Sequence, residues 1–208
     1  MALEVAYQLE FSPSLNVTGG EPFLRKDRFD ILAEMRSRDF AIYLLTNGTL
    51  VDAGRSQALA DLGIRGVQVS IEGPPEIHDS IRGKGSFESS CRGVKHLLEA
   101  GLKVTLNATL SEINGDKFGE IVDIANDLGV QRLGFSRLVP SGRGLGLVDR
   151  MIDSNRLREI YAEIFSLQTG DLEIVTGDPV ASQMRNGSGN EDCGEVATGG
   201  NLSAIFVP

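Results

Sequence analysis

Short apolar runs rich in β-branched residues alternate with amphipathic stretches along most of the chain. The runs predict strands, most of them nearly continuous in apolar character, as buried parallel strands are. The amphipathic stretches between them predict helices. This alternation is typical of βαβ units around a parallel sheet and places the chain in the α/β class. The predicted strands are Leu15–Thr18, Ala41–Leu45, Val67–Ile71, Lys103–Ala108, Arg132–Phe135 and Leu172–Val175.

Several stretches repeat apolar residues at the three- and four-residue spacing of a helix with one buried face. Gly63, Gly101 and Gly129 stand where glycines end helices. Repeated strand–helix units of this length predict a barrel or an open sheet. The apolar faces consist of Phe87, Cys91, Val94 and Leu98; of Phe118, Ile121, Val122, Ala125 and Leu128; and of Leu157, Ile160, Tyr161, Ile164 and Leu167.

The alternation of strands and helices begins and ends abruptly along the chain. Ala2–Phe11 is predicted to be a helix that leads straight into the first strand, whereas a barrel needs a strand before it. Leu202–Pro208 has the character of a strand without a closing turn, and Asn186–Asp192 is the most loop-like stretch. We therefore expect a fragment whose missing first strand exposes a sheet edge. A second copy of the chain could pair with that edge and form a homodimer.

Charge and composition exclude several classes of function. The 208 residues carry 20 Lys and Arg against 29 Asp and Glu, a formal charge of -9, which argues against a nucleic-acid partner. The sequence has neither an apolar run long enough to cross a membrane nor a signal peptide, so a cytoplasmic location is expected. The two cysteines, Cys91 and Cys193, are too few for a disulfide scaffold and too far apart for a metal motif.

The first strand ends in a turn suited to close contact with a ligand. Gly19 and Gly20 have no Cβ atoms to keep a small molecule away, Glu21 can accept hydrogen bonds from an ammonium group, and Pro22 fixes the exit of the chain. By local pattern alone, an ordinary strand-to-helix turn explains these residues more simply.

The ends of the other predicted strands are also polar or rich in glycine. They are Thr46-Asn47-Gly48, Ser70-Ile71-Glu72-Gly73, Asn107 and Arg137–Gly144. Because the carboxyl ends of parallel strands meet at one side of the sheet, we expect these groups to surround a single pocket. Its carboxylate, hydroxyl and amide groups suit a nucleotide-like ligand with an amino acid arm.

A loop is predicted over His78–Gly83, ahead of a helix that begins near Phe87. Within it Arg82 can bind a carboxylate with its forked donors, although a surface salt bridge is the simpler explanation. His78 is the histidine in a plausible site, whereas His96 is expected on a solvated helix face. Cys91 is expected to be a small buried apolar residue.

Taken together, these motifs resemble the radical S-adenosylmethionine enzymes, in particular those with a cysteine-rich C-terminal extension called SPASM. The resemblance spans nearly the whole chain. The residues that carry it are VTGGEPFLRKD (17–27), LLTNGTLVD (44–52), VSIEGPPEIHDSIRGKGSFE (69–88) and RLVPSGRG (137–144). Each motif alone is weak, but their order and spacing together are specific.

The resemblance implies a partial TIM-like (β/α)6 barrel that binds S-adenosylmethionine. The turn Gly19–Pro22 would hold the amino group of the cofactor, in part through Glu21, and Ser70 and Arg82 would hold its carboxylate. A [4Fe-4S] cluster cleaves the cofactor in such enzymes, and the 5'-deoxyadenosyl radical takes a hydrogen from the substrate. The residues implied to lie near the rest of the cofactor are Thr46, Asn47, Asn107 and the backbone around Leu138–Pro140.

The sequence departs from this family in two ways. Asp is usual where Glu72 stands, and the CxxxCxxC motif that binds the cluster is absent. Without those thiolates the chain is expected to be inactive. Residues 1–185 would form the barrel, and 186–208 would hold a linker and the start of a SPASM-like extension, in which Cys193 would bind an auxiliary cluster in the parent protein.

The resemblance implies a peptide or a haem or other cofactor precursor as substrate, together with an electron donor. Two other classes of function stay open. The missing cysteines favour a non-catalytic module that binds a nucleotide or a protein. Gly142-Arg-Gly144-Leu-Gly146 suggests a dinucleotide-binding dehydrogenase, but its spacing differs from GxGxxG and it does not follow the first strand.

Overall fold

In the part of the chain that the structure describes, the fold is a single sheet of seven parallel strands in the order β6-β5-β4-β3-β2-β1-β7. It is seen in a computed structural model that describes residues 14–139, 142–167, 169–178, 181 and 205–207. From β1 to β6, each strand lies beside its neighbours in sequence. The strands are β1 (Ser14–Gly19), β2 (Ala41–Thr46), β3 (Gly66–Ser70), β4 (Val104–Leu110), β5 (Arg132–Arg137), β6 (Glu173–Val175) and β7 (Ile205–Val207).

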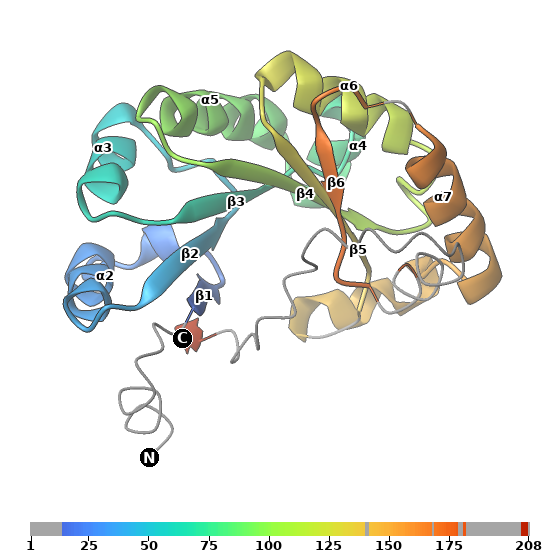
Figure 1. Cartoon of the computed structure of the whole chain (residues 1–208). Helices are drawn as coiled ribbons and strands as arrows, with labels where there is room; N and C mark the ends of the chain where they lie inside the picture. The colour runs from blue at the N-terminus through green and yellow to red at the C-terminus, as the bar shows by residue number, and fades with distance from the viewer. Residues whose placement is uncertain (1–13, 140–141, 168, 179–180, 182–204, 208) are drawn as a thin grey trace, which may run out of the picture.

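Helices follow the strands and cover the convex side of the curved sheet, as Figure 1 shows for α2, α3, α5 and α6. Local sequence sets their ends. Asp52 and Asp153 cap α3 and α7 through their side chains, and Gly129 ends α6 in the left-handed conformation. The helices are η1 (Pro22–Leu24), α2 (Arg28–Ser37), α3 (Ala53–Asp61), α4 (Pro75–Arg82), α5 (Ser86–Glu99), α6 (Phe118–Leu128), η2 (Gly142–Arg150) and α7 (Ser154–Ser166).

The core lies between the sheet and these helices. In β4 the residues Val104, Leu106, Ala108 and Leu110 are buried, whereas the residues between them are half-buried. Strands β1 and β2 alternate in a similar way. The strands therefore differ from the expected pattern of burial on both faces, because the concave face carries polar side chains and is only partly covered.

Most of the predicted elements are confirmed to within about two residues. The predicted parallel strands correspond to β1–β6, and the apolar helix faces belong to α5, α6 and α7. The prediction of a loop over His78–Gly83 is wrong, because these residues belong to α4 and its C-cap. Glycines and prolines surround this short helix, and its N-terminal turn begins at a proline. Because these residues are also typical of loops, apolar periodicity did not predict the helix.

The edge of β1, expected to be open, is paired in part. β7 lies parallel to β1, with Val17, Thr18 and Gly19 opposite residues 205–207. The expected helix over Ala2–Phe11 lies outside the described residues. Within the part of the chain that the structure describes, no helix has the length and apolar character needed to cross a membrane.

Candidate functional site

The turn after β1 is organised by the carboxylate of Glu21. Glu21 caps η1 by accepting a hydrogen bond of 3.1 Å from the backbone N–H of Phe23, and Pro22 occupies the first turn of that helix. A proline is favoured there because its missing N–H would have no partner inside the helix. The sequence Gly-Gly-Glu-Pro thus fixes the direction in which the chain leaves the sheet.

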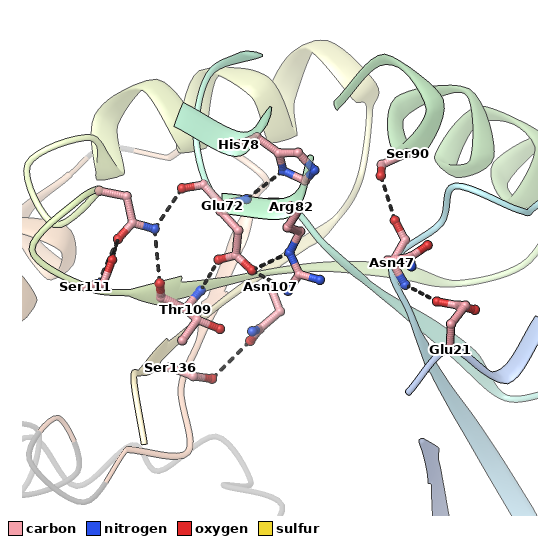
Figure 2. Close-up of polar contacts among 11 residues, drawn as sticks. Glu21, Asn47, Glu72, His78, Arg82, Ser90, Asn107, Thr109, Ser111 and Ser136 are labelled. Atoms are coloured by element: carbon pink, nitrogen blue, oxygen red, sulfur yellow. Dashed lines mark hydrogen bonds and ion pairs between the residues drawn. The ribbon is translucent and has the colours of Figure 1, made fainter. Parts of the chain in front are cut away.

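The same carboxylate joins the end of β1 to the end of β2. Its Oε1 accepts a bond of 2.7 Å from the Thr46 hydroxyl. Its Oε2 accepts one of 2.8 Å from the backbone N–H of Asn47, as Figure 2 shows. Among the described residues no Lys, Arg or His forms an ion pair with Glu21. We call Glu21, Phe23, Thr46 and Asn47 the Glu21 clamp. All of its donors are neutral, so the negative charge remains available to a cation.

Helix α5 supports this clamp from behind. The Ser90 hydroxyl donates a bond of 2.6 Å to the carbonyl of Asn47. Gly48 adopts a φ of +79°, and a Cβ added at Gly93 would clash with the Gly48 carbonyl oxygen. The glycine pair lets α5 approach the Thr-Asn-Gly turn closely enough to hold it.

A second carboxylate lies just after β3. The Glu72 side chain is only 3% exposed, and its Oε1 accepts hydrogen bonds from Nε and Nη2 of Arg82 (Figure 2). Its Oε2 accepts a bond of 2.8 Å from the backbone N–H of Thr109, at the end of β4. A buried carboxylate is stable when it is paired and hydrogen-bonded in this way.

Two fully buried side chains hold the backbone of Glu72. Nδ1 of His78 accepts a bond of 3.1 Å from the Glu72 N–H, and the Asn114 amide donates to the carbonyls of Glu72 and Thr109. Burial, assisted by the positive charge of Arg82, lowers the pKa of His78 to about 4, so the ring is neutral near pH 7. We call Glu72, His78, Arg82, Thr109 and Asn114 the Glu72 cluster.

The predicted residues Ser70 and Asn107 are neighbours in the register of β3 and β4. Both are half-buried at positions that alternate with core residues. Oδ1 of Asn107 accepts a bond of 3.2 Å from the Ser136 hydroxyl, and a Cβ on Gly134 would lie 2.7 Å from the same oxygen. A row of polar groups therefore lies on the concave face beside the Glu72 cluster.

Two cavities touch the predicted site. One of about 340 Å³ is lined by the turn Gly19–Pro22 together with Leu44 and residues of α2. Another of about 390 Å³ is lined by Leu138, Arg137 and residues from 151 to 157. The turn after β1 and the end of β5, which were expected to share a single pocket, therefore line two different cavities.

The remaining candidates are less informative. Cys91 packs against the core and is partly buried, which raises the pKa of its thiol. Cys193 lies outside the described residues. The sequence did not predict the roles of Ser90, Thr109 and Asn114. The side chains of Ser90 and Asn114 hydrogen-bond to backbone carbonyls, and Thr109 takes part through its own backbone, so none of the three leaves a periodic signal in the sequence.

Comparison with known proteins identifies relatives over most of this region. A model of the Radical SAM superfamily matches residues 2–128. The AdoMet-dependent heme synthase of Nitratidesulfovibrio vulgaris is 31% identical over 151 residues, 72% of this chain and 41% of that protein. The Fe-coproporphyrin III synthase of Methanosarcina barkeri is 34% identical over 149 residues, 71% of this chain and 37% of that protein. The chain thus spans about two fifths of the length of these relatives.

A solved structure shares the fold. Streptococcus suis SuiB bound to the precursor peptide SuiA superposes with a TM-score of 0.70 at 18% sequence identity. The alignment covers 83% of this chain and 40% of SuiB. This likeness confirms the α/β fold with a partial barrel of parallel strands.

Proposed function

Since the chain belongs to the radical SAM superfamily, we propose that it forms the part of a radical SAM enzyme that binds S-adenosylmethionine, and that the whole enzyme modifies a tetrapyrrole or peptide precursor. The observation that carries the proposal is the Glu21 clamp, a carboxylate with only neutral hydrogen-bond donors beside a cavity of about 340 Å³. Relatives named as heme and coproporphyrin synthases support a tetrapyrrole substrate, and the SuiB complex supports a peptide.

The charges of the cofactor match the two carboxylate-bearing turns. S-adenosylmethionine carries an ammonium and a sulfonium group, which Glu21 can attract, and a carboxylate, which Arg82 can attract. Open space borders the turn at Gly20, where an added Cβ would meet nothing within 4 Å. Thr46 and Asn47 adjoin Glu21, while Ser70, Asn107 and Leu138 are proposed to contact the rest of the cofactor.

The residues of this chain do not fit the [4Fe-4S] cluster of the family. Three thiolates are needed, whereas the chain has two cysteines, of which Cys91 lies on α5 and packs against the core. Among the described residues no group of three His, Cys, Asp or Glu side chains could hold a metal. We therefore propose binding of the cofactor, and no reductive cleavage, for this chain alone. Three points stay predictions: that Cys193 binds an auxiliary cluster in the parent protein, that an electron donor is a partner, and that two copies of the chain pair through the edge of β1.

A calorimetric titration of S-adenosylmethionine tests the proposal. The wild-type chain should bind it, and Glu21→Ala and Arg82→Ala should each weaken binding roughly tenfold or more, as expected for a lost hydrogen bond to a charged group, while circular dichroism shows a folded protein. Lys84→Ala is the matched control, because Lys84 is exposed beside α4 and outside both carboxylate sites. No binding by a folded wild-type chain would contradict the proposal, and NAD binding in its place would favour the dehydrogenase alternative.

A further inference from the structure

The arrangement of Glu72 suggests a role other than contact with a ligand. Its side chain is only 3% exposed, and both carboxylate oxygens already accept hydrogen bonds from Arg82 and from the N–H of Thr109. A buried oxygen with these partners is poorly placed to bind anything else. Glu72 therefore acts on a ligand through the groups that it holds.

The guanidinium group of Arg82 has two forked edges, and Glu72 occupies one of them. Nε and Nη2 both donate to Oε1 of Glu72, which takes the side-on edge. The other edge consists of Nη1 and the second N–H of Nη2, and in the described part of the chain no hydrogen bond or ion pair to Nη1 is found. The side chain is 31% exposed, so this edge can meet a ligand. A guanidinium edge of this kind matches a carboxylate.

The position of Glu72 is itself fixed by the fold. His78 accepts from its backbone N–H and Asn114 donates to its carbonyl, and the Thr109 N–H that binds its Oε2 belongs to β4 (Figure 2). Arg82, in contrast, ends α4 and has a long side chain with many rotamers. The rigid carboxylate thus selects one orientation of a side chain that would otherwise sample many.

We infer that Glu72 is a positioning residue, which holds Arg82 so that its open edge faces the carboxylate of the bound cofactor. The inference rests on the proposed binding of S-adenosylmethionine and deepens it. Glu72 also offsets part of the charge of Arg82 while the site is empty, so the guanidinium can stay partly buried without its ligand.

The substitution Glu72→Gln separates this role from the general shape of the site. The introduced side chain has nearly the same size as glutamate, but its amide has one oxygen for two sets of donors. If the oxygen accepts from Thr109, the amide nitrogen faces Arg82 donor to donor, and in the flipped orientation the nitrogen faces the Thr109 N–H. In either orientation the hydrogen bonds that hold Arg82 are weakened or misaligned.

The test compares S-adenosylmethionine with its decarboxylated analogue, in which a hydrogen replaces the carboxylate. Wild-type chain should bind S-adenosylmethionine roughly tenfold or more tightly than the analogue, which lacks the charge-assisted bond. Glu72→Gln should raise the Kd of S-adenosylmethionine about tenfold and that of the analogue less than about twofold. Glu72→Asp, which keeps the charge on a shorter side chain, should restore part of the difference between the two ligands, and it serves as the second variant if Glu72→Gln does not fold.

Two results would overturn the inference and separate it from the proposed function. Equal weakening of both ligands by Glu72→Gln would show a structural role only, and equal binding of both ligands by the wild type would show that Arg82 meets no carboxylate. The proposed function would survive either result. Binding of neither ligand by the folded wild-type chain would overturn both.

Discussion

The carboxylates of Glu21 and Glu72 follow parallel strands of the same sheet but differ in the charge of their hydrogen-bond donors. Glu21 accepts from a hydroxyl and two backbone N–H groups, whereas Glu72 accepts from a guanidinium group and one backbone N–H. Glu72 is also much more deeply buried. Among the described residues, the same residue type at equivalent strand ends therefore has a cationic partner in one case, Glu72, and none in the other, Glu21.

The largest effect, on the free energy of unfolding, is expected when the contact between α5 and the turn of the Glu21 clamp is disturbed. Gly93→Ala would place a Cβ against the Gly48 carbonyl oxygen, so α5 or the Thr-Asn-Gly turn must shift. We expect the free energy of unfolding to fall by about 3 kcal/mol, at the upper end of overpacking effects. Denaturant unfolding measures it. Gly119→Ala is the control: it lies in the first turn of α6 with nothing within 4 Å of its Cβ, and it should be neutral or stabilising.

The second prediction separates charge from shape at Glu21. Glu21→Gln keeps the size of the side chain and removes the charge, so S-adenosylmethionine should bind roughly 10 to 30 times more weakly, the loss expected for one hydrogen bond to a charged group. The unfolding free energy should fall by about 1 to 2 kcal/mol, because in either orientation of the amide its nitrogen faces one backbone N–H, that of Phe23 or that of Asn47. Calorimetry and denaturant unfolding measure the two effects. Unchanged affinity would remove the distinction between the two carboxylates.

The third prediction concerns the Glu72 cluster and acid. The pKa of His78 is about 4 in the folded chain and near 6.5 in the unfolded chain, so the unfolded state takes up a proton first as the pH falls. The contribution of His78 to stability is therefore full above about pH 6.5 and should fall by about 1 to 1.5 kcal/mol on acidification to about pH 5.5, and further below it. Urea unfolding at several pH values measures this slope.

His78→Gln should flatten the slope, because it removes the buried group that titrates. His96→Gln is the matched control, since His96 is the other histidine in the sequence and is partly exposed on α5. The control should leave the slope as it is in the wild type. If the slope changed in His96→Gln and not in His78→Gln, the buried ring of His78 would take no part in the pH dependence of stability.

The weakest effect is expected at Thr46. Thr46→Val removes the hydroxyl that donates to Glu21 and accepts from the Gly48 N–H at 3.1 Å. We expect a loss of about 1 kcal/mol in unfolding free energy, typical of one hydrogen bond. Affinity for S-adenosylmethionine should fall only a few-fold, because the Asn47 N–H still orients the carboxylate. A loss as large as that of Glu21→Gln would mean that Thr46 itself contacts the ligand.

Periodicity in the sequence predicted the sheet well, because the strands β1 to β5 and the helices α5, α6 and α7 bury a recurrent set of apolar residues. It failed for α4, because this helix has only eight residues and its buried residue is His78, not an apolar one. A polar residue buried for its hydrogen bond looks the same in a sequence as one that is solvated.

The candidate site was predicted in part. Motifs singled out Glu21, Thr46 and Asn47, which the structure joins by hydrogen bonds. A salt bridge of Arg82 was one of the two explanations that the sequence offered, but its partner Glu72 was not predicted, because the polar end of β3 was expected to face the ligand. Long-range partners such as Asn114 depend on which backbone groups the fold leaves unsatisfied, and this follows only from the three-dimensional arrangement.

A crystal structure of this chain with S-adenosylmethionine would decide between the roles given to the two carboxylates. We expect the ammonium group of the ligand within hydrogen-bond distance of a Glu21 oxygen and its carboxylate on the Nη1 side of Arg82, with the bonds from Arg82 to Glu72 intact. A ligand whose ammonium group lies away from Glu21, or an Arg82 side chain that leaves Glu72 to reach the ligand, would show that this division of roles is wrong.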